Sequence, residues 1–310
     1  MILRFSASSS SRKEARKGVP APLSGDFACR RGAGPASPPR RRLLKGTMSV
    51  LALSGCGTTL LSACGGDYTG GDGPQDAPTP VMNSVANFRD VGGAAPGYST
   101  SDGAHFRRAI LYRSDVLTAN TADTATLEGI GLAGIYDLRT PVEADALPDT
   151  PLSTASYVSL NVLGTHAPPS FAGMSGPELD SAMQAHWREF VMGHTQCMAY
   201  GALLEQIAQA GGPVVVVGGK GVDVAGWAGA LLLLIANVPL EIVVKDFLLT
   251  NAWRSTGVDE DNLAPPVQAS YLQSAFDALQ KGFGDLSRYL NAGLGLSSTT
   301  VDLLRGRLVV

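Results

Sequence analysis

The sequence predicts an α/β fold, a three-layer α/β/α sandwich built on a mostly parallel sheet. Four consecutive valines, 214–217, follow a Gly-Pro break, and such an uninterrupted apolar run is typical of a strand buried on both faces. A Gly-rich loop then leads into the apolar segment Trp227–Ile235, which indicates a buried helix. Strand-like segments precede this loop and helix-like segments follow it. We therefore expect the valine strand at the centre of the sheet, with helices on both faces.

The part of the domain before the valine strand contains the other expected strands. They are a short segment at 86–93, which ends in a Gly turn, and the segments 109–114, 134–139 and 156–162. A helix is predicted over Thr121–Gly129, with Thr121 as its N-cap and an acidic residue in its first turn.

Helices dominate the remainder of the domain. A Pro- and Gly-punctuated loop after Gly164 leads to a helix predicted over Pro177–Val191. Its apolar stripe consists of Leu179, Met183, Trp187 and Phe190. Cys197 lies in the next helix-like stretch and is interpreted as a small core residue. After the Gly-rich loop, the chain is predicted to be helical to its end.

The first 64 residues are interpreted as an export leader. Their beginning is rich in Ser, Arg, Pro and Gly, which favours disorder. Arg40–Lys45 is similar to a twin-arginine export motif, and an apolar stretch follows it. Two lipobox-like sequences end at Cys56 and Cys64. Cys64 is favoured as the lipidation site because a flexible linker, 65–80, follows it, whereas an uncleaved anchor helix is the alternative reading.

Residues 81–310 then form one domain, long enough for a sizeable core. Residues 1–64 hold 11 of the 24 Lys and Arg but only 2 of the 27 Asp and Glu, so the remainder has 13 basic and 25 acidic side chains, a formal charge of −12. This acidity argues against nucleic acid as a partner and against electrostatic binding to anionic membranes. We expect an exported protein of the cell envelope that reaches the membrane only through a lipid anchor.

No metal or cofactor site is expected. His186 and His194 lack the spacing of metal ligands, no His-Glu-x-x-His motif occurs, and His105 and His166 lie in predicted loops. The Gly-rich loop also fails two nucleotide-binding patterns. It has no Gly-x-x-x-x-Gly-Lys-Ser/Thr sequence, and the dinucleotide pattern Gly-x-Gly-x-x-Gly breaks after Gly221.

The loop and its flanking strand and helix resemble the signature of Cys-dependent bacterial tyrosine/serine/phosphoinositide phosphatases, His-Cys-x-x-Gly-Lys-Asp-Arg-Thr-Gly-Trp. In a gapless alignment, this pattern is matched by Gly221, Asp223, Gly226 and Trp227. Three further segments typical of that family occur in order: Asn-Phe-Arg-Asp-Val-Gly-Gly at 87–93, Leu-Tyr-Arg-Ser-Asp at 111–115 and Asp-Leu-Arg-Thr-Pro-Val-Glu at 137–143. The resemblance covers residues 85–308 and implies a protein-tyrosine-phosphatase-like fold.

The same resemblance implies a chemistry that this chain does not fully carry. Family members attack phosphorus with a thiolate and hold the phosphoryl oxygens with a guanidinium, so phosphorylated proteins or small phosphomonoesters are the implied partners. Here the His, Cys, Lys and Arg positions are occupied by Val217, Gly218, Val222 and Val224. A two-residue insertion would place Gly219-Lys220 on the family's Gly-Lys, but it leaves Val216 at the Cys position and Val224 at the Arg position. No cysteine is followed by an Arg six positions later.

The resemblance implies a set of site residues, each assigned by its position in the aligned family segments. Asp223 stands at the family's general-acid position. The phosphate-binding loop consists of Gly218, Gly219, Lys220, Gly221, Val222, Asp223 and Val224. Arg89, Asp90 and Arg139 are expected to line the pocket, although a scaffold role stays open for them. Arg113 and Asp137 are interpreted as scaffold, and the helix over 177–191 as either a lid or a core helix.

Two functions are therefore predicted. The first is an exported pseudophosphatase, in which the loss of Cys and Arg impairs the family's phosphomonoester hydrolysis. The second is a non-catalytic module that binds phosphate or a phosphoprotein through loop amides, Lys220 and the N-terminus of the following helix.

Overall fold

The computed structural model describes residues 77–310, except 165–169, 172, 220–221 and 254–265. The predicted leader, most of the linker, and both lipidation candidates, Cys56 and Cys64, lie outside the described residues. Lys220 and Gly221 of the Gly-rich loop, and His166, lie outside them as well. What the sequence predicts for these positions stays a prediction.

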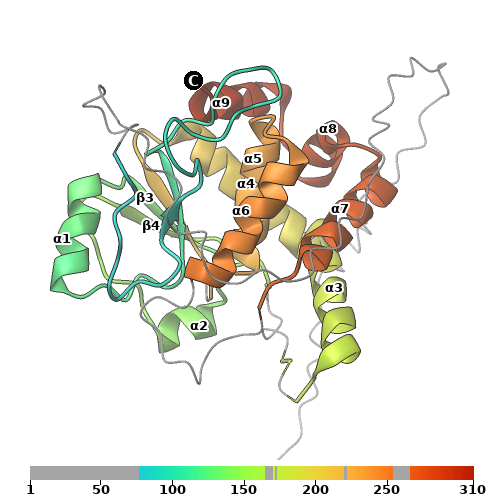
Figure 1. Ribbon diagram of the computed structural model, residues 1–310, viewed down its shortest axis with the longest axis horizontal. Coiled ribbons are helices and arrows are strands. Elements are labelled where there is room, and N and C mark those ends of the chain that lie inside the picture. The colour runs from blue at the N-terminus through green and yellow to red at the C-terminus, as the bar shows by residue number, and fades with distance from the viewer. Residues whose placement is uncertain (1–76, 165–169, 172, 220–221, 254–265) are drawn as a thin grey trace, which may run out of the picture.

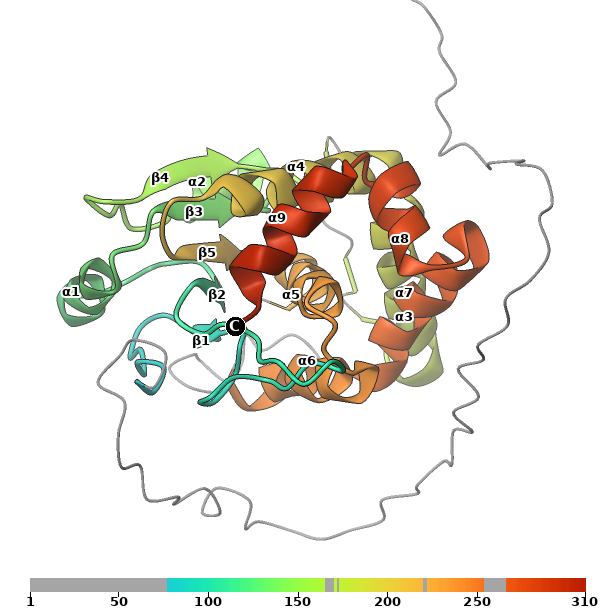
Figure 2. The same cartoon turned by 90° about the horizontal axis from the view of Figure 1, so that it is seen from above.

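Five strands form one mostly parallel sheet (Figure 1), with β5 (Val214–Val217) at its centre (Figure 2). The others are β1 (Arg89–Asp90), β2 (Leu111–Ser114), β3 (Gly134–Asp137) and β4 (Ser156–Ser159). Their order is β1-β2-β5-β3-β4, with β1 antiparallel to β2 and all other neighbours parallel. Val217 pairs with Ser114 of β2 and with Asp137 of β3, so these three strands end at one edge. The predicted sheet and its central strand are confirmed.

Both faces of β5 are buried, which explains its uninterrupted valines. Val214 and Val216 pack into the larger core cluster, together with apolar residues of the helices on that face. Val215 and Val217 point to the other face and pack in a second cluster with Tyr112. A strand covered on one face would show apolar and polar residues in alternation.

Helices cover both faces of the sheet (Figure 2). They are α1 (Thr121–Ile130), α2 (Pro141–Ala146), α3 (Gly176–Met192), α4 (His194–Gln209), α5 (Val224–Ile235), α6 (Leu240–Trp253), α7 (Ala269–Phe283), α8 (Leu286–Arg288), a π-helical turn (Tyr289–Gly293) and α9 (Ser298–Leu308). Helix α1 lies on one face, and α4, α5 and α9 lie on the other, with α3 and α7 farther from the sheet.

The apolar stripe predicted for the helix after Gly164 is confirmed. Met183, Trp187 and Phe190 of α3 are buried in the core, and Leu179 is partly buried and packs against it. Cys197 is also buried, as expected, on the next helix. Within the described part of the chain, no helix is both long and apolar enough to span a membrane.

Strand β4 is shorter than the predicted segment 156–162. The ladder to β3 ends at Ser159, yet Leu160 still donates to the carbonyl of Asp137, and Val162 donates to that of Leu138. The chain therefore follows its neighbour to the predicted end, but without regular pairing, because the neighbour has passed from strand β3 into the turn before α2.

The predicted N-cap of α1 is wrong. Asn120, not Thr121, caps the helix, and its side-chain oxygen accepts a hydrogen bond of 2.9 Å from the amide of Asp123. Asn and Thr are both favoured as N-caps, so residue type alone did not place the cap.

Replacing Asn120 by Ala should lower the free energy of unfolding by about 1 kcal/mol, because the amide of Asp123 loses its acceptor. Thr121→Ala is the matched control, one position along the chain, and should change stability by less than about 0.5 kcal/mol. Urea unfolding of the two variants and the parent measures both values. Equal losses would contradict the assignment of Asn120 as the cap.

Candidate functional site

The Gly-rich loop connects the end of β5 to the start of α5, at the edge where β2 and β3 also end. In open α/β sheets, ligands bind beyond the carboxyl ends of the strands. The amide of Gly218 continues the sheet by donating to the carbonyl of Ser114 at 3.3 Å. The predicted loop therefore lies where the fold class places a ligand site.

Gly218 and Val224 are packed against each other. Both residues are buried, and a Cβ atom added to Gly218 would lie 2.6 Å from Cγ2 of Val224 and 3.2 Å from Cβ of Ala225. Val222 is also buried and belongs with Val224 to the larger core cluster. A cysteine side chain at position 218 would thus begin in space that the valine methyl group already occupies.

Asp223, at the predicted general-acid position, faces helix α3. Its Oδ2 atom lies 3.7 Å from Nε2 of His186, whose side chain is 10% exposed. Asp223 is the N-cap residue of α5, yet its side chain makes no capping hydrogen bond. Its Oδ1 atom is buried, and no donor within the described residues reaches it.

His186 is a site residue that the sequence did not reveal. Its ring contacts Phe190 edge-on with ring centroids 4.5 Å apart, and Phe171 with centroids 5.8 Å apart. In the sequence, His186 stands out only as a possible metal ligand, and it lacks the spacing that a metal site requires. The approach to Asp223 depends on how α3 packs, and no local pattern encodes it.

Glu143 is a second carboxylate beside the loop that the sequence did not reveal. It completes a capping box at the start of α2: its Oε2 atom accepts from the amide and the hydroxyl of Thr140 at 2.9 and 2.7 Å. Its Oε1 atom would lie 3.2 Å from a Cβ atom at Gly219. A side chain at position 219 would therefore press against this carboxylate.

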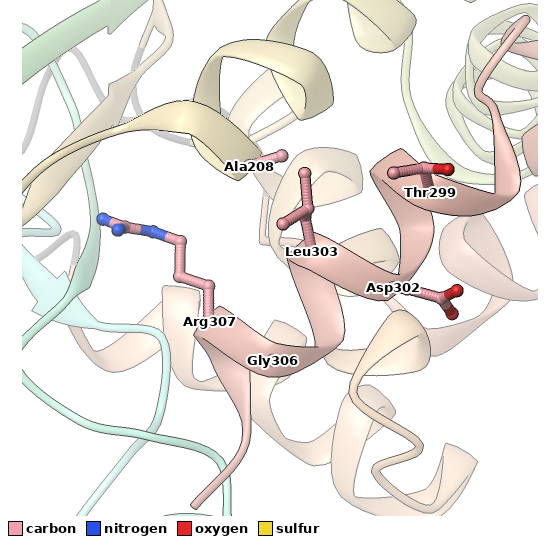
Figure 3. A pocket seen from close by; sticks show the side chains of 6 residues that line it. All are labelled: Ala208, Thr299, Asp302, Leu303, Gly306 and Arg307. Atoms are coloured by element: carbon pink, nitrogen blue, oxygen red, sulfur yellow. The ribbon is translucent and has the colours of Figure 1, made fainter.

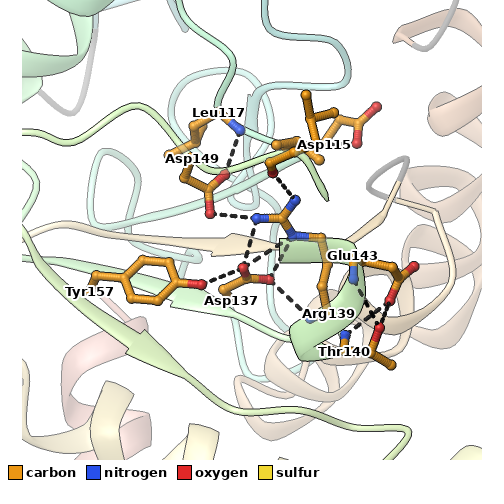
Figure 4. A network of polar contacts seen from close by, with 10 residues as sticks. Asp115, Leu117, Asp137, Arg139, Thr140, Glu143, Asp149 and Tyr157 are labelled. Carbon is orange, nitrogen blue, oxygen red and sulfur yellow. Dashed lines mark hydrogen bonds and ion pairs between the residues drawn. The ribbon is translucent and has the colours of Figure 1, made fainter. Parts of the chain in front are cut away.

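Arg139 is the centre of a buried network that holds the turn after β3 (Figure 4). It donates to both carboxylate oxygens of Asp137 and to Asp149, at 2.8 to 3.1 Å, and to the carbonyl of Leu147 at 2.7 Å. Tyr157 donates to Asp137 from β4 at 2.6 Å. Burial disfavours the charge of Arg139, but the hydrogen bonds and charges of Asp137 and Asp149 outweigh it and raise the pKa of Arg139.

Arg89 and Arg113 share one buried carboxylate on α6. Asp246 Oδ2 lies 3.6 Å from Arg89 Nη2 and 3.9 Å from Arg113 Nη1. Arg89 also donates to the carbonyl of Asp246 at 3.1 Å and to Thr250 at 3.2 Å, and Tyr98 donates to Asp246 Oδ1 at 3.1 Å. Burial, reinforced by the charge of Arg89, lowers the pKa of Arg113 to about 9.

The position of the Arg113 guanidinium explains why a glycine stands at 226, one of the positions matched to the family signature. A Cβ atom at Gly226 would lie 3.3 Å from Arg113 Nη2, and one at Gly229 would lie 3.4 Å from Arg113 Nη1. The two glycines on α5 therefore allow the helix to pass directly over the buried guanidinium.

Asp90 fixes the turn that follows β1. Its carboxylate accepts from the amide of Gly92 at 2.8 Å and from that of Ala109 at 2.6 Å, and it lies 3.8 Å from Arg108 Nε. Burial raises the pKa of Asp90, against the opposing effect of these two amides. Arg89, Asp90 and Arg139 are all about 3% exposed and have protein partners. That they line a ligand pocket stays a prediction.

A surface pocket of about 510 Å³ lies between α4 and α9, away from the loop (Figure 3). It is lined by Ala208, Thr299, Asp302, Leu303, Gly306 and Arg307. Arg307 donates to the carbonyls of Ala210 and Gly212, which precede β5. This pocket is therefore at the opposite end of β5 from the loop. In the part of the chain that the structure describes, no three His, Cys, Asp or Glu side chains are grouped as a metal site requires.

Comparison with known proteins finds one relative by sequence and two similar solved structures. A protein of Cupriavidus necator, whose name assigns it to the tyrosine-protein phosphatases, is 26% identical over 246 residues, which cover 73% of this chain and 86% of that protein. Two solved structures are similar to parts of the chain. They are the core catalytic domain of the PP-IP phosphatase SIW14 from S. cerevisiae (11% identity, TM-score 0.30, 64% of this chain and 98% of that one) and TpbA from P. aeruginosa (14% identity, TM-score 0.30, 65% and 99%).

The family model described as the tyrosine phosphatase family matches residues 80–310. This match spans the whole sheet, the loop between β5 and α5, and every helix named above. The chain belongs to the tyrosine phosphatase family.

Proposed function

We propose that this chain is a pseudophosphatase, a member of the tyrosine phosphatase family that does not carry out the family's phosphoryl transfer. One observation carries the proposal: Gly218 and Val224, at the nucleophile and phosphate-clamp positions, are packed against each other as a complementary pair. Glycine offers no nucleophile, and valine offers no donor to the phosphoryl oxygens. Loss of one transition-state donor alone typically lowers the rate about 10²- to 10³-fold.

The remaining polar groups of the loop do not replace the missing ones. Asp223 could protonate a leaving group only after a nucleophile had attacked, and Glu143 is engaged with Thr140. Cys197, the one cysteine within the described residues, is buried on α4, where its Sγ atom contacts the carbonyl of Val191 at 3.3 Å. A buried thiol with an apolar environment is a poor nucleophile.

Hydrolysis of p-nitrophenyl phosphate by the full chain tests the proposal. We expect no release of nitrophenol above the uncatalysed rate. Turnover by the parent that is abolished by Asp223→Asn would overturn the proposal, because it would place a working reaction centre in this loop. If turnover survives Asp223→Asn, the same assay on Gly218→Val decides its source: turnover that survives both substitutions comes from a contaminating enzyme.

A non-catalytic phosphate-binding module is the second candidate. It is favoured by the position of α5, whose N-terminus follows the Gly-rich loop, and by the buried Arg113 beneath Gly226. Against it stand the carboxylates of Asp223 and Glu143 at the same loop. Like charges near a bound anion weaken binding.

Inorganic phosphate should therefore leave the melting temperature of the chain nearly unchanged. A site with a Kd of about 1 mM would add about 1.4 kcal/mol at about 10 mM phosphate, which corresponds to a rise of about 3 °C. We expect a rise below about 1 °C, measured by differential scanning calorimetry against the same concentration of chloride. A phosphate-specific rise of the larger size would favour the binding module.

We also propose that the chain is exported and held at the membrane by a lipid on Cys64. The support is the twin-arginine-like segment at 40–45, the apolar stretch after it and the flexible linker that follows Cys64. Expression of Cys64→Ala and Cys56→Ala variants tests it. Cys64→Ala alone should move the protein from the membrane fraction to the soluble fraction, whereas release by Cys56→Ala alone would shift the assignment to Cys56.

A further inference from the structure

Helix α1 is held to the sheet by few apolar side chains. Of its ten residues, only Asp123 and Leu127 are buried, and Ile130 is partly buried against the second core cluster. In helix α5, by contrast, every residue except Leu234 is buried. The α1 sequence also contains three Thr, one Asp and one Gly, which are weak helix formers. Neither apolar burial nor helix propensity therefore contributes much to the stability of α1.

A buried carboxylate supplies contacts that apolar side chains do not. Asp123 accepts hydrogen bonds from the amides of Asn83 and Ser84 at 2.9 and 2.6 Å, and from the Ser84 hydroxyl at 2.6 Å. The Ser84 hydroxyl oxygen in turn accepts from the amide of Asn120, the cap of α1, at 2.8 Å. Residues 82–86, here called the strap, have no helix or strand of their own and are thus fastened to the first turn of α1.

A second carboxylate, Glu128, fastens the last turns of α1. It accepts from the amide and the hydroxyl of Ser153 at 2.6 and 2.8 Å, and these bonds lower the pKa of Glu128. Burial disfavours the charge of Asp123, but its bonds with Ser84 and Asn83 outweigh this effect and lower its pKa as well. Both acceptors are therefore charged, and water can replace their partners at a lower cost than exposing a packed core.

The strap and α1 cover the same face of the sheet. Met82 and Val85 of the strap are buried in the second core cluster, together with Leu127 of α1 and with Val215 and Val217 of β5. Figure 2 shows α1 on the side of the sheet away from α4, α5 and α9. The buried residues of α5 belong to the larger cluster on that other side. Loss of the strap and α1 would thus expose the second cluster and leave the larger one covered.

We propose that the strap and α1 form one unit that detaches from the sheet while the larger core stays folded, and that Asp123 holds the two parts of this unit together. The inference goes beyond the proposed pseudophosphatase function and does not depend on it. The predicted linker, 65–80, leads directly into the strap. In the proposed lipid-anchored protein, the domain is therefore tethered through the part that opens first.

Hydrogen exchange of the full chain tests the unit, measured by mass spectrometry at urea concentrations below those that unfold the domain. Amides of 82–86 and 121–130 should exchange at least about tenfold faster than those of 224–235 in α5. Their exchange should also depend less on urea, because opening of the unit exposes less surface than global unfolding does. Equal rates and equal urea dependence in α1 and α5 would overturn the proposal.

The substitution Asp123→Asn tests the role of the carboxylate. It keeps the size of the side chain but removes the charge, so exchange in the strap and in α1 should rise about tenfold, while peptides of α5 stay unchanged. Asp277→Asn on α7 is the matched control. This carboxylate is exposed and accepts a hydrogen bond from Gln273 on its own helix, so exchange in the strap and α1 should not change.

Three results with Asp123→Asn would contradict the proposal. Unchanged exchange would show that the carboxylate does not hold the unit. Faster exchange in α1 but not in the strap would show that the two parts open separately, and an equal rise in α5 would show global unfolding instead. If the variant does not fold, the urea dependence of the parent decides. None of these rates depends on turnover of p-nitrophenyl phosphate, so failure of this proposal is distinguishable from failure of the proposed function.

Discussion

The double variant Gly218→Cys, Val224→Arg should hydrolyse p-nitrophenyl phosphate, whereas the parent chain should not. Cysteine at 218 would begin at the carboxyl end of the central strand, next to the N-terminus of α5, where the helix dipole and loop amides favour a thiolate. Arginine at 224 would supply the bidentate donor for the phosphoryl oxygens. We expect the rate to exceed that of either single variant by at least about 10²-fold.

The two single variants show separately how each substitution affects hydrolysis and how it affects stability. Gly218→Cys alone places its Cβ atom 2.6 Å from Cγ2 of Val224, so it should lose about 1 to 3 kcal/mol of stability and remain inactive. Val224→Arg alone has no nucleophile and should also be inactive. In the double variant, the unbranched Cβ of arginine removes the methyl group that blocks the cysteine, so part of the lost stability should return.

The matched control for the nucleophile is Gly218→Ser, Val224→Arg, which keeps the size of the side chain but should be silent because a serine hydroxyl is not ionised there. A double variant that folds, as judged by circular dichroism and urea unfolding, yet is inactive would contradict the view that restoring these two groups is enough to restore hydrolysis. Activity of Gly218→Cys alone would show that the arginine position is not required in this chain.

Local patterns in the sequence were sufficient for the central elements of the fold. The valines of β5 and the apolar run of α5 each carry their own signal, because burial on every side leaves no polar position. The loop could be located because it lies between these two apolar segments. The N-cap of α1 was misplaced by one residue, since hydrogen-bond geometry and not residue type distinguishes Asn120 from Thr121.

The surroundings of the loop could not be predicted in the same way. His186 and Glu143 approach it from α3 and α2, and their proximity depends on helix packing over long sequence distances. The family resemblance of the segments around Arg89 and Arg139 implied that these residues line a pocket at the loop, which stays a prediction. It did not indicate partners such as Asp246, which is 157 residues from Arg89 along the chain.

Replacing Asp246 by Ala should lower the free energy of unfolding by about 3 to 5 kcal/mol, because two buried guanidinium groups lose the carboxylate that they share. Asp277→Ala on α7 is the matched control: this carboxylate is exposed and accepts a hydrogen bond from Gln273 on the same helix, so the change should stay below about 0.5 kcal/mol. Urea unfolding of both variants beside the parent measures the two values.

A second substitution identifies the cause of that loss as charge rather than packing. Adding Arg113→Met to Asp246→Ala removes one of the two cations, so the double variant should be more stable than the sum of the single losses predicts, by about 1 to 3 kcal/mol. Strict additivity would mean that the two side chains do not interact, and that Asp246 acts through Arg89 and Tyr98 instead. Because Arg113 lies directly beneath Gly226, a favourable coupling would also show that this cluster connects α6 to the helix that begins at the altered loop.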